Sequence, residues 1–209
     1  MGMRIFLTAA AWLATAAPLA AQAWDSPTFF SPRPGEDIGA YLIIPDGDGA
    51  TGFAGIWRQS GNINLGVRAG LAGDDNIQVG AEFYGPVMLA GPGSSLLFSW
   101  ILGLGAGFDN DETWLRVPVG LSAGVALGGP GSIAVIMPYV HPRLAIDFIA
   151  VETSDGEVTD TELNFPIDIG ADAAIGESFV LRLGATFGDG QNTFGAGIAY
   201  RMPRRVVVR

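Results

Sequence analysis

The chain has 209 residues, the size of one ordinary domain or one barrel. It has no cysteine, which excludes a disulfide scaffold, and its net charge of -10 argues against a nucleic-acid-binding protein. Only 15% of its residues are charged and its mean hydropathy is +0.35, whereas soluble domains are typically about one quarter charged. This composition favours a membrane protein.

The first segment has the pattern of a secretory signal peptide. Arg4 supplies the positive start, residues 5–20 are apolar, and Ala21-Gln22-Ala23 matches an A-x-A cleavage site. We therefore predict that residues 1–23 are a signal peptide removed on export, so that the mature chain begins at Trp24.

Two apolar runs, 86–108 and 117–140, are long enough to cross a membrane as helices. Each is interrupted by Gly-Pro-Gly, at 91–93 and 129–131. This tripeptide is a turn signal, and a proline inside a helix costs about 3 kcal/mol. Each run is therefore predicted to form two strands joined by a turn.

Alternation of apolar residues with small or polar ones predicts about ten strands. In residues 63–84, two such runs flank the turn Gly-Asp-Asp-Asn, which is typical of a β-hairpin. The predicted strands are 37–45, 50–59, 63–72, 77–89, 96–108, 113–127, 133–151, 163–175, 179–188 and 193–202. Residues 24–36 are predicted to be an extended, proline-rich linker, 37–202 an antiparallel up-and-down transmembrane β-barrel, and 203–209 a tail.

Two architectures fit strands with one apolar and one mixed face. A soluble lipocalin-like barrel has the apolar face inside, whereas a transmembrane barrel turns it toward lipid. Many of the 31 glycines lie on the mixed face. A solvated face has no need of glycine, which weakens strands, but a crowded lumen needs small residues beside long ones. The glycines therefore favour the transmembrane barrel.

The turns distinguish the two ends of the barrel. Counted from the N-terminus, the odd-numbered connections hold 13 of the 21 acidic residues. Short periplasmic turns and longer outer loops are typical of outer-membrane barrels, so the acidic end is predicted to face outward and both termini to lie on the periplasmic side. The longest acidic connection, 152–162, is predicted to be a mobile external loop.

Aromatic residues are expected to form a belt at each membrane interface. The residues assigned to the outer belt are Phe108, Trp114, Phe148, Phe165, Phe187 and Phe194. Those assigned to the periplasmic belt are Trp57, Phe98, Trp100, Phe179 and Tyr200.

The last predicted strand resembles the assembly signal of Gram-negative outer-membrane β-barrel proteins. Thr193, Gly195, Ile198 and Tyr200 supply its polar, glycine, apolar and aromatic positions. The chain departs from the usual pattern by continuing after the aromatic residue with Met202 and the tail PRRVVVR. The resemblance implies insertion by the barrel-assembly machinery and contact with outer-membrane lipid and lipopolysaccharide.

A set of charged residues shares the lumen-facing phase of the strands. Its members are Arg68, Glu82, Arg116, His141, Arg143, Asp147, Asp168, Asp172, Arg182 and Arg201, and Arg58 is a further candidate. They could line a polar pore or pair as a network that fills the lumen. Eight strands give a filled interior and porin channels need 16–18, so about ten strands favour a plugged or very narrow lumen.

Two features could indicate an enzyme. Gly120-Leu121-Ser122-Ala123-Gly124 fits the G-x-S-x-G motif, but that motif acts at a strand-to-helix turn and here lies inside a predicted strand. His141 is the only histidine and could act as a base, although a structural role bonded to its neighbours is favoured. No catalytic residue, resident metal site or cofactor is predicted.

The acidic turns could attract divalent cations, because hard cations prefer carboxylate oxygens. The candidate residues are Asp46, Asp48, Asp74, Asp75, Asp109, Asp111 and Glu112, which do not match an EF-hand. The sequence thus predicts a non-enzymatic outer-membrane barrel, either a structural barrel or a narrow passive pore. An outer-membrane hydrolase and a soluble periplasmic binding barrel remain as alternatives.

Overall fold

The computed structural model describes residues 26–47, 50–61, 63–73, 76–87, 95–109, 112–128, 134–153, 156–188 and 192–202. The predicted signal peptide and the tail 203–209 lie outside these residues, as do parts of several acidic turns. In the described ranges, no helix is both long and apolar enough to cross a bilayer.

The chain folds into β-strands that follow the predicted alternation. Their bounds are β1 Asp37–Pro45, β2 Gly52–Gln59, β3 Asn64–Ala72, β4 Asn76–Pro86, β5 Leu96–Phe108, β6 Glu112–Val125, β7 Ala134–Thr153, β8 Gly156–Asn164, β9 Ile167–Ile175, β10 Phe179–Phe187 and β11 Thr193–Arg201. Most of these bounds lie within a few residues of the predicted ones.

Antiparallel pairing of consecutive strands closes the sheet into a barrel. β1 pairs with both β2 and β11, and β6 pairs with β7, so the ring has no gap in its pairing. β8 and β9 both pair with β7 in one continuous register, with Ala145 opposite Asn164 and Pro142 opposite Ile167. They are therefore two halves of one strand interrupted at Phe165-Pro166, and the predicted ten-stranded barrel is confirmed.

Side chains alternate between the lumen and the outer surface. On β1, Asp37, Gly39 and Tyr41 are buried in the lumen, whereas Ile38 and Leu42 are exposed outside. All the remaining strands of the closed barrel likewise carry exposed large apolar residues on their outer faces. Such a surface is stable in lipid but not in water, and this confirms that the apolar face points outward.

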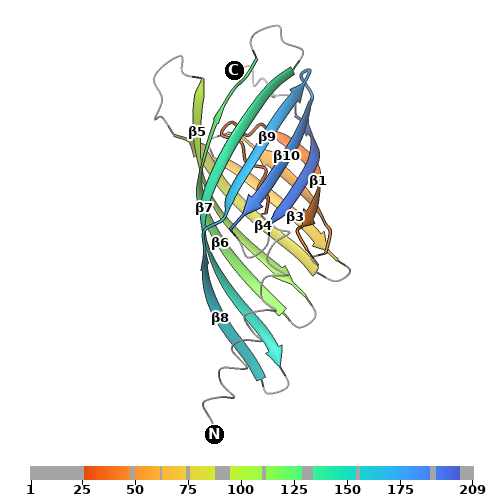
Figure 1. Ribbon diagram of the computed structural model, residues 1–209, viewed down its shortest axis with the longest axis vertical. Coiled ribbons are helices and arrows are strands. Elements are labelled where there is room, and N and C mark those ends of the chain that lie inside the picture. Colours follow the sequence, from red (N-terminus) through yellow and green to blue (C-terminus); the bar gives the residue numbers. More distant parts are fainter. Residues whose placement is uncertain are drawn as a thin grey trace.

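The two ends of the barrel differ in height. Figure 1 shows β8 at the lower end, beyond β9 and β10, and the end of β11 at the opposite end. β7 has 20 residues, so with a tilt of about 40° it rises about 50 Å, roughly twice the apolar band of a membrane barrel. The β7–β8 side therefore projects from the membrane at the end that carries the acidic connections.

The structure corrects the prediction of a loop at 152–162. Instead, β7 continues to Thr153 and β8 begins at Gly156, and the described residues of the two strands pair from Thr153 opposite Gly156 to Asp147 opposite Glu162. The backbone hydrogen bonds of the pair hold the segment in place despite its charge.

Trp114 was also predicted wrongly, as part of the outer aromatic belt. It lies in the lumen phase of β6 and is buried. Opposite Trp114 on the adjacent strand β5 is Gly107, where an added Cβ would collide with the indole ring. The small residue on one strand makes room for the large one on the next. The other five aromatic residues of that belt are exposed on the outer surface.

Residues 26–32 occupy the lumen, and residues 33–36, of which Arg33 is exposed, lead from them to β1. Residues 26–36 have no regular secondary structure, and every side chain from Ser26 to Pro32 is buried. This segment precedes β1 and runs inside the barrel toward the end where β1 begins (Figure 1). We call residues 26–32 the plug. Its position inside the barrel was not foreseen from the sequence.

Candidate functional site: the plugged lumen

Charged side chains of the wall hold the backbone of the plug. Arg58 donates to the carbonyl oxygens of Phe29 and Thr28, at 3.0 and 3.1 Å, and Arg68 donates to that of Thr28 at 2.9 Å. Farther along the plug, the hydroxyl of Ser122 donates to the Phe30 carbonyl at 2.8 Å. Because a strand-free segment cannot satisfy its own backbone groups, these wall side chains supply the bonds that it lacks.

Plug side chains bind the wall in return. The hydroxyl of Thr28 contacts Asp168, and that of Ser31 donates to Asp172 at 2.8 Å. Phe29 has a φ of 50°, in the left-handed region that non-glycine residues rarely adopt. Its ring stacks on Tyr41 with centroids 4.4 Å apart. A residue stays in such a conformation only when its surroundings determine it, so the plug has one specific seat.

Glycines in the lumen wall shape that seat. A Cβ added at Gly195 would collide with the ring of Phe29, one added at Gly184 would lie 2.9 Å from Pro27, and one added at Gly124 would lie 3.0 Å from Pro32. A ten-stranded barrel is wider than the eight-stranded kind that its own side chains fill. The plug occupies the extra space, and the glycines allow it to approach the wall.

Adding one methyl group should test this fit. We expect Gly195→Ala to destabilise the barrel by about 1–3 kcal/mol, because overpacking forces the Phe29 ring or the wall to shift. Gly55→Ala is the matched control, since the nearest atoms to its added Cβ are 4.0 Å away. Urea unfolding in liposomes measures both. Combining Gly195→Ala with Phe29→Ala should restore part of the loss, and strictly additive effects would contradict the fit.

Ion pairs join neighbouring strands of the wall. Arg116 lies opposite Asp147 in the register and binds it through Nε and a terminal nitrogen, each at 2.6 Å. Such two-point pairing fixes both side chains. Arg68 reaches Glu82 at 2.6 Å, and Arg182 reaches Asp172 at 3.3 Å. All six side chains are at least 89% buried, so the pairs substitute for water around each charge.

Two further pairs skip a strand. Arg58 on β2 binds Glu82 on β4 at 2.8 Å, across β3, whose residue between them is Gly66. Arg182 on β10 binds Asp37 on β1, across β11, and Gly197 of β11, opposite Arg182, makes room for the ring of Tyr41, whose hydroxyl also binds Arg182. Alternate strands lie about 10 Å apart, so a side chain on the middle strand would block each bridge. For Arg58 and Glu82, Gly66 at the middle position leaves the path open.

His141 belongs to a closed polar cluster. Its Nδ1 lies 2.9 Å from the Thr28 hydroxyl and 3.3 Å from Asp168, whose other oxygen accepts from Arg143 at 3.0 Å and Thr186 at 2.6 Å. A catalytic triad needs the base to lie between nucleophile and carboxylate, using both ring nitrogens. Here Nδ1 faces both groups.

The other ring nitrogen of His141 has no room for a substrate. A Cβ added at Gly120 would lie only 2.6 Å from Nε2, so the barrel wall covers it. The ring is fully buried and packs beside Phe30, with centroids 5.4 Å apart. In this structure the cluster holds the plug.

The remaining predicted residues take ordinary places in the barrel. Ser122 is buried within the unbroken strand β6 and bonded to the plug, so the G-x-S-x-G motif forms no nucleophile turn. Arg201 is half-buried at the end of β11, and the ion pairs found among the described residues do not include it. Thr193 and Gly195 face the lumen, whereas Ile198 and Tyr200 are exposed on the outer surface.

The described residues contain no group of three or more His, Asp or Glu side chains that could hold a metal ion. Several of the acidic turn residues, Asp48, Asp74, Asp75 and Asp111, lie outside the described ranges. Cation binding at these turns therefore stays a prediction from the sequence.

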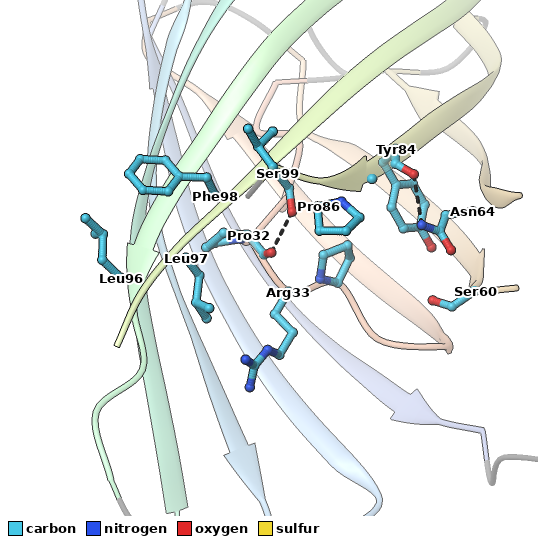
Figure 2. Close-up of a pocket in the computed structure, with 13 residues that line it drawn as sticks. Pro32, Arg33, Ser60, Asn64, Tyr84, Pro86, Leu96, Leu97, Phe98 and Ser99 are labelled. Atoms are coloured by element: carbon cyan, nitrogen blue, oxygen red, sulfur yellow. Dashed lines mark hydrogen bonds between the residues drawn. The ribbon is translucent and has the colours of Figure 1, made fainter. Parts of the chain in front are cut away.

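Two cavities flank the segment where it leaves the plug. One, of about 350 Å³, is lined by Pro32, Arg33, Tyr84, Phe98 and Ser99 among others. Figure 2 shows the Ser99 hydroxyl bonded to the carbonyl of Pro32, at 2.6 Å, with Arg33 extending away from this bond. The second, of about 450 Å³, lies between Arg33 and the ends of β9 and β11. Both open near the end of the barrel where β1 begins, and the buried plug lies beyond them.

The closed antiparallel ring and its apolar exterior define the chain as an outer-membrane-type transmembrane β-barrel. No protein-family model and no curated protein matches the sequence.

Solved structures with a similar fold include the N-terminal β-barrel domain of Pseudomonas aeruginosa OprF, with 18% identity, coverage of 78% of this chain and 94% of that chain, and a TM-score of 0.41. The KdgM porin has 10% identity, coverage of 80% and 99%, and a TM-score of 0.41. The Neisserial surface protein A has 13% identity, coverage of 79% and 95%, and a TM-score of 0.37. These similarities concern the barrel fold alone.

Proposed function

We propose that this chain is a non-enzymatic barrel of the outer membrane whose lumen is closed by its own N-terminal segment. The observation that carries the proposal is the seating of the plug: Arg58 and Arg68 from the wall converge on the carbonyl of Thr28. A pore lining would leave such arginines facing water. Here they are buried, and the plug and Glu82 accept hydrogen bonds from both of them.

The proposed role is structural, with a narrow pore as the second candidate. The two cavities at the periplasmic end favour the second candidate, because they leave space beside residues 32–36 into which the segment could move. Insertion by the barrel-assembly machinery, contact with lipopolysaccharide and divalent cations at the acidic turns belong to the same proposal. Its support is the exposed apolar surface and the acidic end of the barrel.

Planar-bilayer recording tests the closure. The mature barrel is expected to conduct little or no current, whereas a variant lacking residues 26–32 is expected to show steady conductance, because the plug fills the lumen between its charged walls. Heat-modifiable gel mobility must first show that the shortened chain still forms a barrel. Equal conductance of the folded barrel with and without the plug would overturn the proposal.

A further inference from the structure

β8 has an unpaired edge. Among the described strands it pairs only with β7, and β10 ends at Phe187, opposite Ile167 of β9, before it could reach β8. A closed barrel normally leaves no edge, because an unpaired strand exposes backbone donors and acceptors. In this molecule the ring closes through β9, and β8 extends past it.

The backbone groups that face this edge can be identified. The N–H of Arg143 on β7 donates to the carbonyl of Pro166 at 2.9 Å, so in the continuous register of β7 with β8 and β9 the even-numbered residues direct their backbone groups toward β7. Thr161 faces the other edge, where its N–H donates to the side chain of Asp160 at 2.7 Å. In an antiparallel strand, alternate residues direct their N–H and C=O groups to opposite edges. Glu157 and Thr159 consequently share the direction of Thr161, and their backbone groups point to the free edge.

This edge lies outside the membrane. On the outer face of β8, Glu157, Thr159 and Thr161 are polar, whereas the next outward residues, Leu163 and Phe165, are apolar and exposed by 56% and 63%. The change from apolar to polar side chains marks the lipid boundary between Thr161 and Leu163. Residues 157–161 are thus accessible from the aqueous side.

The charge of the edge selects among possible partners. Residues 152–164 contain five carboxylates and no basic residue. A second copy of β8 would place acidic residues against acidic residues, which destabilises cross-strand pairs, whereas a strand bearing arginine or lysine would place opposite charges together. Threonine and valine on β8 are residues that favour the extended conformation.

We propose that β8 is a docking edge for an extended basic segment of another protein, which adds to the sheet as a further antiparallel strand. Main-chain bonds to Glu157, to Thr159 and to the carbonyl of Thr161 would hold the segment, and Glu157, Asp160 and Glu162 would favour basic side chains on it. This is the strand-addition mode of peptide recognition, in which backbone bonds supply affinity and side chains supply selectivity.

The test measures binding of a labelled peptide that alternates arginine with valine to the full barrel in nanodiscs without lipopolysaccharide. Thr159→Pro removes one free-edge N–H and leaves the β7 pairing intact, so it should weaken binding by roughly tenfold or more. Thr159→Ala is the matched control, because it keeps the N–H, and it should bind as the original chain does. Glu157→Gln with Asp160→Asn should weaken binding and reduce its salt dependence.

Three outcomes would overturn the proposal. Equal binding to Thr159→Pro and Thr159→Ala would mean that charge alone attracts the peptide, as it would any cation. If a peptide whose valines are replaced by proline bound as tightly as the arginine–valine peptide, charge alone would again explain the binding. A dimer of the barrel that forms without peptide and is abolished by Thr159→Pro would identify a second copy as the occupant.

Discussion

Arg182→Ala is expected to destabilise the barrel by about 3–5 kcal/mol, the usual effect of removing one partner from a buried ion pair. Arg182 donates to both oxygens of Asp37, to one of Asp172 and to the hydroxyl of Tyr41. Its loss would leave two carboxylates in the lumen without this cation. Equilibrium unfolding in urea, from detergent micelles or liposomes, measures the change.

Arg201→Ala is the matched control for this variant. Arg201 lies at the end of the adjacent strand β11 and is half-buried, but it takes no part in the ion pairs described above. Its replacement should therefore change the free energy of unfolding by about 0.5 kcal/mol or less. Similar effects of the two substitutions would mean that loss of any arginine matters, and that the network has no special role.

The strands and their inner and outer faces could be predicted because alternation depends only on neighbours in the sequence. Arg116 and Asp147 share the lumen phase of strands joined by one turn, so a pair between them follows from phase and order. The same reasoning brings Arg68 close to Glu82. A period of two therefore indicates both the face of a residue and its neighbours on the adjacent strands.

The pairs that skip a strand could not be predicted in this way. Alternation places Arg58 and Glu82 in the same lumen but two strands apart, and it says nothing of contacts across the middle strand. The missing signal was Gly66, which lies between them in register. The lumen glycines were interpreted only as small residues beside long ones, whereas the position of Gly66 also decides which long side chains can meet.

The plug was missed because its proline content indicates an extended linker. The segment contains two adjacent aromatic residues, Phe29 and Phe30, which a solvated linker has no reason to carry. These rings pack against Tyr41 and Tyr84 of the wall.

The hairpin at 152–162 was missed because its charge suggested a loop. Its sequence nevertheless contains Asp155-Gly156, a hairpin turn signal, followed by the strand-favouring residues Val158, Thr159 and Thr161.

Glu82→Ala should both destabilise the barrel and release the plug. The carboxylate accepts from Arg58 at 2.8 Å and from Arg68 at 2.6 Å, and both arginines hold the carbonyl of Thr28. Without Glu82 two buried guanidinium groups lose their counter-charge and repel each other. We expect a loss of about 3–5 kcal/mol in the free energy of unfolding.

Hydrogen exchange of the plug amides distinguishes this double effect from simple destabilisation. The arginines can position the plug only if Glu82 keeps them in place. In that case the amide protons of Thr28 and Phe29 should exchange faster in Glu82→Ala than in the original chain, under conditions where the strand amides stay protected. Glu82→Gln keeps an acceptor oxygen and loses the charge, so its plug amides should exchange at a rate between those of the original chain and Glu82→Ala. A destabilised barrel whose plug amides exchange as slowly as before would show that aromatic packing of Phe29 and Phe30, and not the network, keeps the lumen closed.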